Sequence, residues 1–279
     1  MKVSGFTFIR NAIKYDFPIC EAITSVLPVV DEFVVNVGNS EDETLDLIQS
    51  LDDTRIKIVE SVWDDTLKRD GQVLGSQQDI ALSHCSGDWA FLIQGDEVVH
   101  EDDLSVIREA MEKHFSDEQV LGLVFRVLHF KGDYWSVDPW MYRKATRIIK
   151  NHRNIYSTTD CCDFRTQESS KMLKSASSSR IIPARIFHYG WVKDAKVFRE
   201  KKCEMESWWH GDTRSPEELD REAALQAEFP NYDILKDFHG CHPRVMDNRI
   251  KAGQRLRVRN NRWLNWKFYR EVIRHGFKG

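Results

Sequence analysis

Short segments rich in apolar residues alternate with longer segments in which apolar residues recur every three or four positions. The strand-like segments cover residues 3–9, 33–37, 56–59 and 89–93, and helix-like segments begin near residues 16, 40, 71 and 102. A repeated strand and helix order favours a mainly parallel sheet with right-handed connections. The pattern therefore predicts an α/β fold, whose ligand sites lie at the carboxyl ends of the strands.

The pattern changes after residue 120. Residues 120–130 form a long strand-like segment, and residues 131–190 give only weak, irregular strand signals around the serine-rich stretch 175–179. From residue 193 the apolar spacing is helical again. We expect residues 1–130 to form the core of the fold and 131–192 to form a further part of the same domain. Residues 193–279 are expected to form a C-terminal helical accessory region with a basic tail.

Charge is unevenly distributed along the chain. The formal net charge is −4, but residues 251–279 contain nine Lys and Arg against one acid, Glu271. The tail therefore carries +8 and the rest of the chain −12. This segregation indicates an anionic partner for the tail, which is a membrane surface, a nucleic acid or the acidic remainder of the chain itself.

Two absences in the sequence bear on location. No apolar run approaches the eighteen residues of a membrane span, and the amino terminus starts with a strand-like pattern instead of a signal peptide. The six cysteines are scattered without a C-x-x-C spacing. We expect a cytoplasmic protein with reduced thiols, attached peripherally to the inner face of the membrane if the tail binds there.

The segment Gln94-Gly95-Asp96-Glu97 places two carboxylates directly after the fourth strand-like segment. Carboxylate oxygens at the carboxyl end of a central strand can hold a hard divalent cation. In the alternative interpretation, Asp96 is a solvated turn residue and Glu97 stabilises the start of a helix.

The chain resembles the family-2 glycosyltransferases of the GT-A fold in residues 34–44 (VVNVGNSEDET) and 87–99 (GDWAFLIQGDEVV). The likeness covers residues 1–130 well and the rest loosely. The Ser-x-Asp-x-Thr element that follows the second strand in that family is similar to residues 40–44. The Asp-x-Asp element that follows its fourth strand corresponds to residues 94–97. Residues 188–191 (HYGW) are similar to a short segment in a bacterial envelope-sugar subset of these enzymes.

The resemblance implies a divalent cation, Mn²⁺ or Mg²⁺, that is held against the diphosphate of a nucleotide-sugar donor. Asp96 is the expected ligand. Gln94 stands where the family has its first aspartate, and because an amide brings no charge, the site is expected to be weaker or to use another ligand. His188 or Glu97 would fill that place, although a histidine is equally compatible with ordinary packing.

The resemblance also implies donor contacts from polar residues at the strand ends, namely Arg10, Asn11, Asn39, Gln94 and Gly95. Asn39 stands where the family usually has an acidic residue that recognises the base or ribose. Gln78 lies in the apolar stripe of the helix over 71–85, where a buried amide needs a partner and the donor sugar is one candidate. The structural alternatives are surface-loop residues, a turn asparagine and a hydrogen-bonded core amide.

Inverting members of the family use a carboxylate to deprotonate the acceptor hydroxyl. Asp133 is the preferred candidate, because a glycine and aromatic residues beside a carboxylate suit a sugar-facing loop. Asp160 is the second candidate, with Asp163 close to it. Tyr134, Trp135 and Trp140 can stack on an acceptor sugar or simply pack.

The sequence and the resemblance together predict an inverting, metal-dependent glycosyltransferase. It would transfer a sugar from a nucleotide-sugar donor to a glycan or lipid-linked acceptor in envelope polysaccharide or lipopolysaccharide synthesis. One alternative is a non-catalytic nucleotide-sugar-binding module that has lost its first aspartate. Another is a sugar nucleotidyltransferase, although residues 5–16 lack its glycine-rich basic loop. Nucleic-acid binding would rest on the tail alone, where arginines and aromatics interleave, and is disfavoured.

Overall fold

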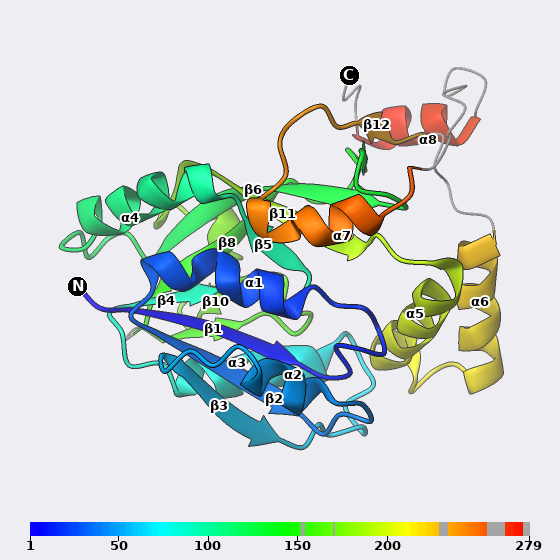
Figure 1. Cartoon of the computed structure of the whole chain (residues 1–279), viewed down its shortest axis with the longest axis horizontal. Coiled ribbons are helices and arrows are strands. Elements are labelled where there is room, and N and C mark those ends of the chain that lie inside the picture. The colour runs from blue at the N-terminus through cyan, green and yellow to red at the C-terminus, as the bar shows by residue number, and fades with distance from the viewer. Residues whose placement is uncertain (152–153, 170, 229–233, 256–265, 276–279) are drawn as a thin grey trace.

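The computed structural model describes residues 1–151, 154–169, 171–228, 234–255 and 266–275 (Figure 1). Within these residues the main sheet has ten strands. They are β1 (Val3–Ile9), β2 (Glu32–Gly38), β3 (Ile56–Ser61), β4 (Trp89–Leu92), β5 (Glu97–Val99), β6 (Gly122–Lys131), β7 (Ser136–Val137), β8 (Lys144–Lys150), β11 (Ser179–Trp191) and β12 (Lys236–Asp237). A separate antiparallel pair joins β9 (Ile155–Ser157) to β10 (Phe164–Thr166).

The order in the main sheet is β12-β7-β6-β8-β4-β1-β2-β3, with β11 paired to both β5 and β6. Strands β3, β2, β1 and β4 are parallel neighbours, as are β6 and β11. Strand β8 runs antiparallel between β4 and β6, and β5 runs antiparallel to β11. The predicted α/β fold with a mainly parallel core is therefore confirmed.

Eight α-helices and four short 3₁₀ turns are described. The α-helices are α1 (Ile19–Val26), α2 (Thr44–Gln49), α3 (Gln72–Ser83), α4 (Leu104–Lys113), α5 (Ala195–His210), α6 (Pro216–Glu228), α7 (Asp247–Ala252) and α8 (Trp266–His275). The 3₁₀ turns are η1 (Leu27–Val29), η2 (Glu101–Asp103), η3 (Leu173–Ser175) and η5 (Arg244–Met246). The expected C-terminal helices are present.

The period-2 alternation of the strands divides the core between the two faces of the sheet. In β4, Trp89 and Phe91 pack in the cluster that also contains apolar residues of α1, α2 and α4. Ala90 and Leu92 point the other way, into a cluster with Ala81 of α3. Because both faces of β4 are buried, this strand reads as a continuous apolar run, as central parallel strands do.

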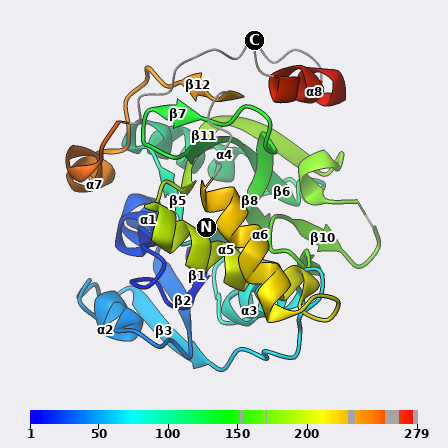
Figure 2. The same ribbon diagram turned by 90° about the vertical axis from the view of Figure 1, so that its right-hand side faces the viewer.

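Helices α5 and α6 lie beside the end of the sheet towards which β1 points (Figure 1). Turned by 90°, the view shows both helices in front of that end (Figure 2). The last turn of α5 is joined to the start of α3, since the backbone N–H groups of Asp70 and Gly71 donate to the carbonyls of Trp209 and Trp208. The C-terminal region therefore covers the edge of the sheet where ligands are expected.

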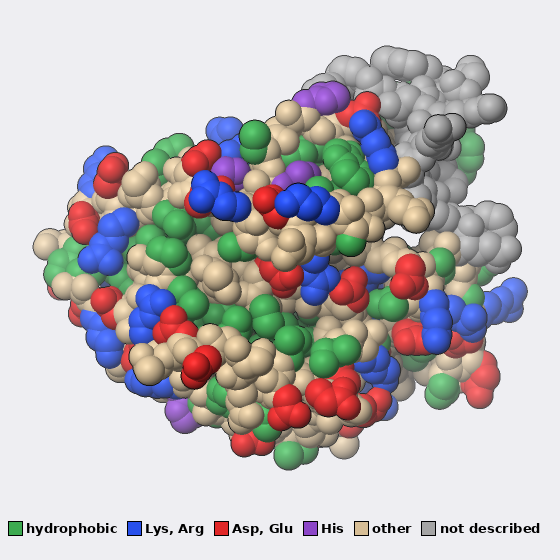
Figure 3. All heavy atoms as spheres, viewed as in Figure 1, with side chains coloured by type: hydrophobic (Ala, Val, Ile, Leu, Met, Phe, Trp, Pro, Cys, Tyr) green, Lys and Arg blue, Asp and Glu red, His purple; other side chains and the backbone are tan. Residues whose placement is uncertain are grey.

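Residues 131–192, which gave weak strand signals, contribute β7, β8 and β11 to the same main sheet. On the face shown in Figure 3, Lys and Arg side chains are interspersed with Asp and Glu, so no large patch of one sign forms there. Within the described ranges, no helix combines the length and apolar character needed to cross a bilayer.

Candidate donor and metal site

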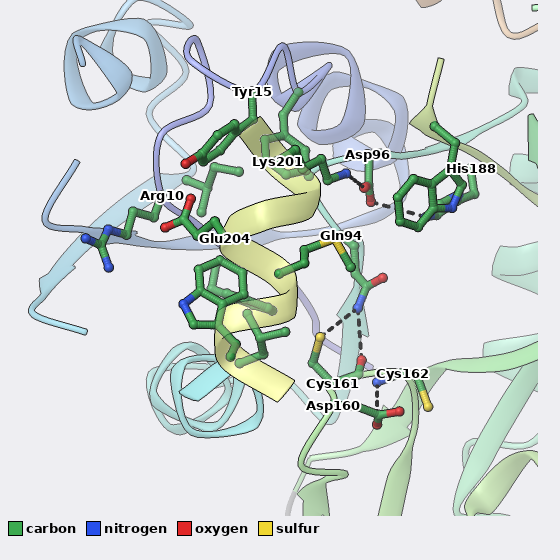
Figure 4. Close-up of a pocket in the computed structure, with 18 of the residues that line it drawn as sticks. Arg10, Tyr15, Gln94, Asp96, Asp160, Cys161, Cys162, His188, Lys201 and Glu204 are labelled. Atoms are coloured by element: carbon green, nitrogen blue, oxygen red, sulfur yellow. Dashed lines mark hydrogen bonds and ion pairs between the residues drawn. The ribbon is translucent and has the colours of Figure 1, made fainter. Parts of the chain in front are cut away.

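A cavity of about 260 Å³ lies where the carboxyl ends of β1 and β4 meet α5 (Figure 4). Its aromatic lining comes from Phe8, Tyr15, Phe17, Trp63, Tyr142, Trp191, Trp208 and Trp209. Its polar lining comes from Arg10, Gln94, Asp96, Asp160, His188, Lys201 and Glu204. An apolar cavity with a few converging polar groups is the usual form of a small-molecule site.

Asp96 occupies the turn between β4 and β5, and its carboxylate faces the cavity. Its Oδ1 lies 3.6 Å from Nε2 of His188, and its Oδ2 accepts a 3.0 Å hydrogen bond from Nζ of Lys201. The backbone fixes this arrangement, since Tyr189 N–H donates to the Asp96 carbonyl over 2.8 Å. Figure 4 shows the three side chains converging from the β4–β5 turn, β11 and α5.

The HYGW segment supplies more than the histidine. A methyl group at Gly190 would overlap the Asp96 carboxylate and would lie 2.8 Å from Cε1 of His188. Only glycine therefore leaves room for these two side chains to meet. The Gly190 carbonyl also accepts a 3.0 Å hydrogen bond from Lys201.

The protonation states of this cluster follow from its burial and its charges. Although burial opposes ionisation, the ammonium of Lys201 and the imidazole of His188 hold the pKa of Asp96 below its ordinary value. Burial lowers the pKa of His188, so the imidazole is neutral near pH 7. A carboxylate and a neutral imidazole are both competent metal ligands.

The neighbouring carboxylate, Glu97, points away from the cavity. It forms a fully buried ion pair with Arg147 of β8, with N···O distances of 2.6 and 2.7 Å. Arg147 also donates to the carbonyls of Thr146 and Cys162. Glu97 is thus committed to the interior and is not available as the alternative metal ligand.

Gln94 and Asp160 lie on another wall of the cavity. The Gln94 amide donates to the Cys161 carbonyl over 2.9 Å and so connects the end of β4 to the loop before β10. Asp160, in that loop, accepts from the Thr158 hydroxyl over 2.7 Å and from the Cys162 N–H over 3.3 Å. Although burial opposes ionisation, these hydrogen bonds hold the pKa of Asp160 below its ordinary value.

Arg10 marks the opposite end of the cavity (Figure 4). Its guanidinium pairs with Asp65 over 3.0 Å and lies 5.6 Å from the ring centroid of Trp63. Glu204 of α5 faces the same end, and its burial raises the pKa of its carboxyl group. Gly95, which also lines the cavity, has little space around it, because a methyl there would lie 2.8 Å from Cδ1 of Ile9.

Four predicted site residues lie outside the cavity lining. Asn11 accepts from the Glu41 N–H, and Asn39 accepts from the Trp63 N–H, so both hold neighbouring loops together. Gln78 is buried and donates to the Ser157 hydroxyl over 2.8 Å. It is therefore a hydrogen-bonded core amide, which was the alternative to a donor contact. Asp133 is buried in the β6–β7 turn, where it accepts from the Trp135 N–H over 2.9 Å.

Sequence reasoning missed the contribution of α5. Lys201, Glu204, Met205, Trp208 and Trp209 all line the cavity, and their spacing of three, four, seven and eight residues places them on one face of the helix. The sequence signal that could have indicated this contribution is a helical stripe of apolar residues that also contains a lysine and a glutamate. The aromatic residues proposed for acceptor stacking lie elsewhere, since Tyr134 packs on Tyr189 and Trp140 on Phe268.

Similar solved structures include TarS residues 1–349 of S. aureus in complex with UDP, at 16% identity and a TM-score of 0.41, covering 82% of this chain and 73% of that one. The same protein with UDP-GlcNAc gives 15% identity, a TM-score of 0.45 and coverages of 83% and 73%. A third structure is glucosyl-3-phosphoglycerate synthase from Mycobacterium tuberculosis in complex with Mn²⁺, UDP and phosphoglyceric acid. It gives 16% identity and a TM-score of 0.31, and the match covers 47% of this chain and 44% of that one. A comparison with curated protein sequences gives no match.

Residues 18–171 match a family model described as Glycosyl transferase family 2. The match covers more than half of the chain and includes β2, the α3 helix, Asp96 and the loop that carries Asp160. The chain therefore belongs to glycosyl transferase family 2 and is a glycosyltransferase with an α/β fold of the GT-A type.

Proposed function

We propose that the chain transfers a sugar from a nucleotide-sugar donor to a glycan or lipid-linked acceptor, with inversion at the transferred carbon. The observation that carries the proposal is that Asp96 and His188 line the same cavity as Asp160. Asp96 and His188 suit the binding of a diphosphate leaving group through a cation. Asp160 suits deprotonation of an acceptor hydroxyl. A binding module could use Asp96 and His188 but would not need Asp160 as a base.

The donor set fits a divalent cation. Oδ1 of Asp96 and Nε2 of His188 lie 3.6 Å apart, and the lack of a side chain at Gly190 lets these two groups approach each other. Within the described residues, no three His, Cys, Asp or Glu side chains gather into a complete metal cage. Two protein ligands are sufficient where substrate phosphates and water complete the coordination. A bound Mn²⁺ or Mg²⁺ would neutralise charge on the departing nucleoside diphosphate.

The remaining chemistry belongs to residues of the chain. Asp160 is ionised near neutral pH and can take the proton of the acceptor hydroxyl as that oxygen attacks the sugar. Arg10, at the other end of the cavity, can contact the nucleoside part of the donor. With a donor bound, the aromatic lining would restrict the access of water and so limit hydrolysis of the donor.

We expect Asp160→Asn to lower the turnover of sugar transfer by roughly a hundredfold or more, since the amide keeps the shape of the side chain but cannot accept a proton. Donor affinity, measured by calorimetry, should remain close to that of the wild type. Asp133→Asn is the matched variant, because Asp133 is a buried turn aspartate outside the cavity. A larger loss in Asp133→Asn than in Asp160→Asn would reverse the assignment of the base.

The function itself is tested by donor binding and turnover. Thermal unfolding is measured with UDP, GDP, CMP and dTDP sugars, each with and without Mn²⁺, and the best donor is then assayed for release of its nucleoside phosphate. A transferase should be stabilised by one donor class and release the nucleotide in a metal-dependent reaction. Stabilisation without any release would favour a binding module. Formation of a nucleotide sugar and pyrophosphate from a sugar 1-phosphate and a nucleoside triphosphate would favour a nucleotidyltransferase.

Helix α8 supports a further part of the proposal, namely contact with an anionic membrane. Phe268 docks the helix on the domain through Trp140, while Trp266, Tyr269 and Ile273 are 65%, 47% and 84% exposed. These three positions share one helical face, and Arg270 and Arg274 lie beside them. Aromatic and aliphatic side chains next to arginines are typical of helices that lie in the bilayer interface. Leu256, Arg262 and Trp263 of the same basic tail, which we also expect to contact the membrane, lie outside the described residues.

We expect the full chain to sediment with vesicles that contain anionic lipid and to lose binding as salt is raised, because each basic group near the surface adds about 1 kcal/mol. The double variant Trp266→Ser, Ile273→Ser should sediment much less, and truncation after Gly253 should abolish binding. Leu225→Ser, at a 51% exposed position on α6, is the control. Equal recovery of the wild type in the supernatant with and without vesicles would contradict membrane contact.

A further inference from the structure

A lysine side chain from α5 is buried at the proposed cation site. Lys201 is 7% exposed and is the one fully buried residue among the described residues of α5, whose other side chains are intermediate or exposed. Its Nζ donates to Oδ2 of Asp96 and to the Gly190 carbonyl, both over 3.0 Å. The ammonium also lies 4.4 Å from the ring centroid of Phe17 and 5.2 Å from that of Trp191.

This arrangement is costly for a residue with no role beyond packing. Removing an ammonium from water requires compensation by partners of opposite charge and by hydrogen bonds. An ammonium has three N–H donors, and the contacts to Asp96 and Gly190 account for two of them. The third N–H makes no hydrogen bond to the described residues, and it is available to a ligand in the cavity that Lys201 lines.

Charge balance identifies the class of that ligand. One carboxylate and one divalent cation leave a single positive charge to face a diphosphate, which carries about two negative charges. Gln94, which lies on another wall of the same cavity, adds no charge. The ammonium of Lys201 supplies the missing positive charge beside Asp96.

We infer that Lys201 is a binding residue for the diphosphate of the nucleotide-sugar donor and acts there as a second, protein-borne cation. The inference rests on the proposed function, which supplies the diphosphate. It assigns to α5 a direct part in donor binding, in addition to covering the end of the sheet. It also explains why the helix presents a lysine to the Asp96 carboxylate, 105 residues away in the sequence.

The alternative is that Lys201 only neutralises Asp96 and leaves when a metal ion arrives. The two roles predict opposite effects of Lys201→Met, which keeps an unbranched side chain one atom shorter and removes its charge. A diphosphate-binding lysine makes nucleoside diphosphate binding weaker when it is lost. If the lysine instead competes with the metal, its loss makes Mn²⁺ binding tighter, and nucleotide binding becomes tighter with it.

The test measures binding by calorimetry at saturating Mn²⁺. The probe is whichever of UDP, GDP, CDP and dTDP stabilises the wild type most against thermal unfolding. We expect Lys201→Met to raise the Kd for this nucleoside diphosphate roughly tenfold or more, as expected for loss of a charge-assisted hydrogen bond, with a smaller effect on the matching nucleoside. Lys202→Met is the matched control. The ammonium of Lys202 pairs with Glu206 over 2.7 Å, and Lys202 does not line the cavity.

An unchanged or lower Kd in Lys201→Met, together with wild-type binding that requires Asp96, would overturn the role of Lys201 and leave the proposed function intact. Failure of the wild type to bind any of the four nucleoside diphosphates would overturn both. If Lys201→Met does not fold, Lys201→Gln provides the same comparison, because its amide can still donate to Asp96 without a charge.

Discussion

Replacing Asp96 by asparagine is expected to lower the turnover of sugar transfer roughly a thousandfold, which corresponds to about 4 kcal/mol of transition-state stabilisation. The amide keeps the size of the side chain but removes the carboxylate that contacts both His188 and Lys201. The leaving nucleoside diphosphate would then lose a ligand of its cation. The measurement is the release of nucleoside diphosphate across a Mn²⁺ titration, with thermal unfolding to confirm that the variant folds.

Asp102→Asn serves as the control for this substitution. Asp102 is an aspartate in the η2 turn with an 82% exposed side chain, and its loss should leave turnover near the wild-type value. Removal of metal by EDTA should reproduce the Asp96→Asn defect in the wild-type enzyme. Near-normal turnover of Asp96→Asn, or of the wild type in EDTA, would show that transfer does not depend on a cation held by Asp96.

Arg147→Met should lower the free energy of unfolding by about 3–5 kcal/mol, since it leaves Glu97 charged and unpaired in the interior. Both side chains are fully buried, and the two N···O contacts measure 2.6 and 2.7 Å. The melting temperature should fall by roughly 10 °C for a chain of this size. Differential scanning calorimetry at neutral pH, with urea unfolding as a second probe, provides the measurement.

Two comparisons make this stability prediction specific. Arg199→Met removes an exposed pair with Asp220 of similar N···O distance, 2.6 Å, and should change stability by no more than about 1 kcal/mol. The double variant Glu97→Leu, Arg147→Met should recover part of the loss, because no unpaired charge remains. Equal effects of Arg147→Met and Arg199→Met would mean that the buried pair contributes no more than a surface pair.

The core of the fold could be predicted from the sequence because its signals are local. The apolar residues of β1 and the continuous apolar run in β4 mark strands that are buried along their whole length, and helices with periodic apolar stripes separate such strands in the sequence. The position of Asp96 could be predicted for the same reason, since the end of a strand is visible in the sequence and parallel strands present their carboxyl ends to ligands. Family resemblance then indicated the chemistry.

The antiparallel insertion of β8 between β4 and β6 could not be predicted, because strand order depends on pairing between distant segments. For residues 131–192 the local pattern is weak and irregular. Only the tertiary structure shows that β7, β8 and β11 of this segment belong to the main sheet. The same limit applies to Asp133, whose glycine and aromatic neighbours suggested a sugar-facing loop. The tertiary structure buries it in a turn outside the cavity.

The contrast between Asp96 and Glu97 shows most clearly what each level decided. The sequence by itself determined that two carboxylates follow a buried strand, but adjacent acids have no local feature that assigns them different roles. Tertiary structure decided that Glu97 pairs with Arg147, 50 residues away, while Asp96 meets His188 of β11 and Lys201 of α5. The physical reason is that a buried charge must be compensated by a partner in space, and the chain can supply that partner from any element the fold brings near.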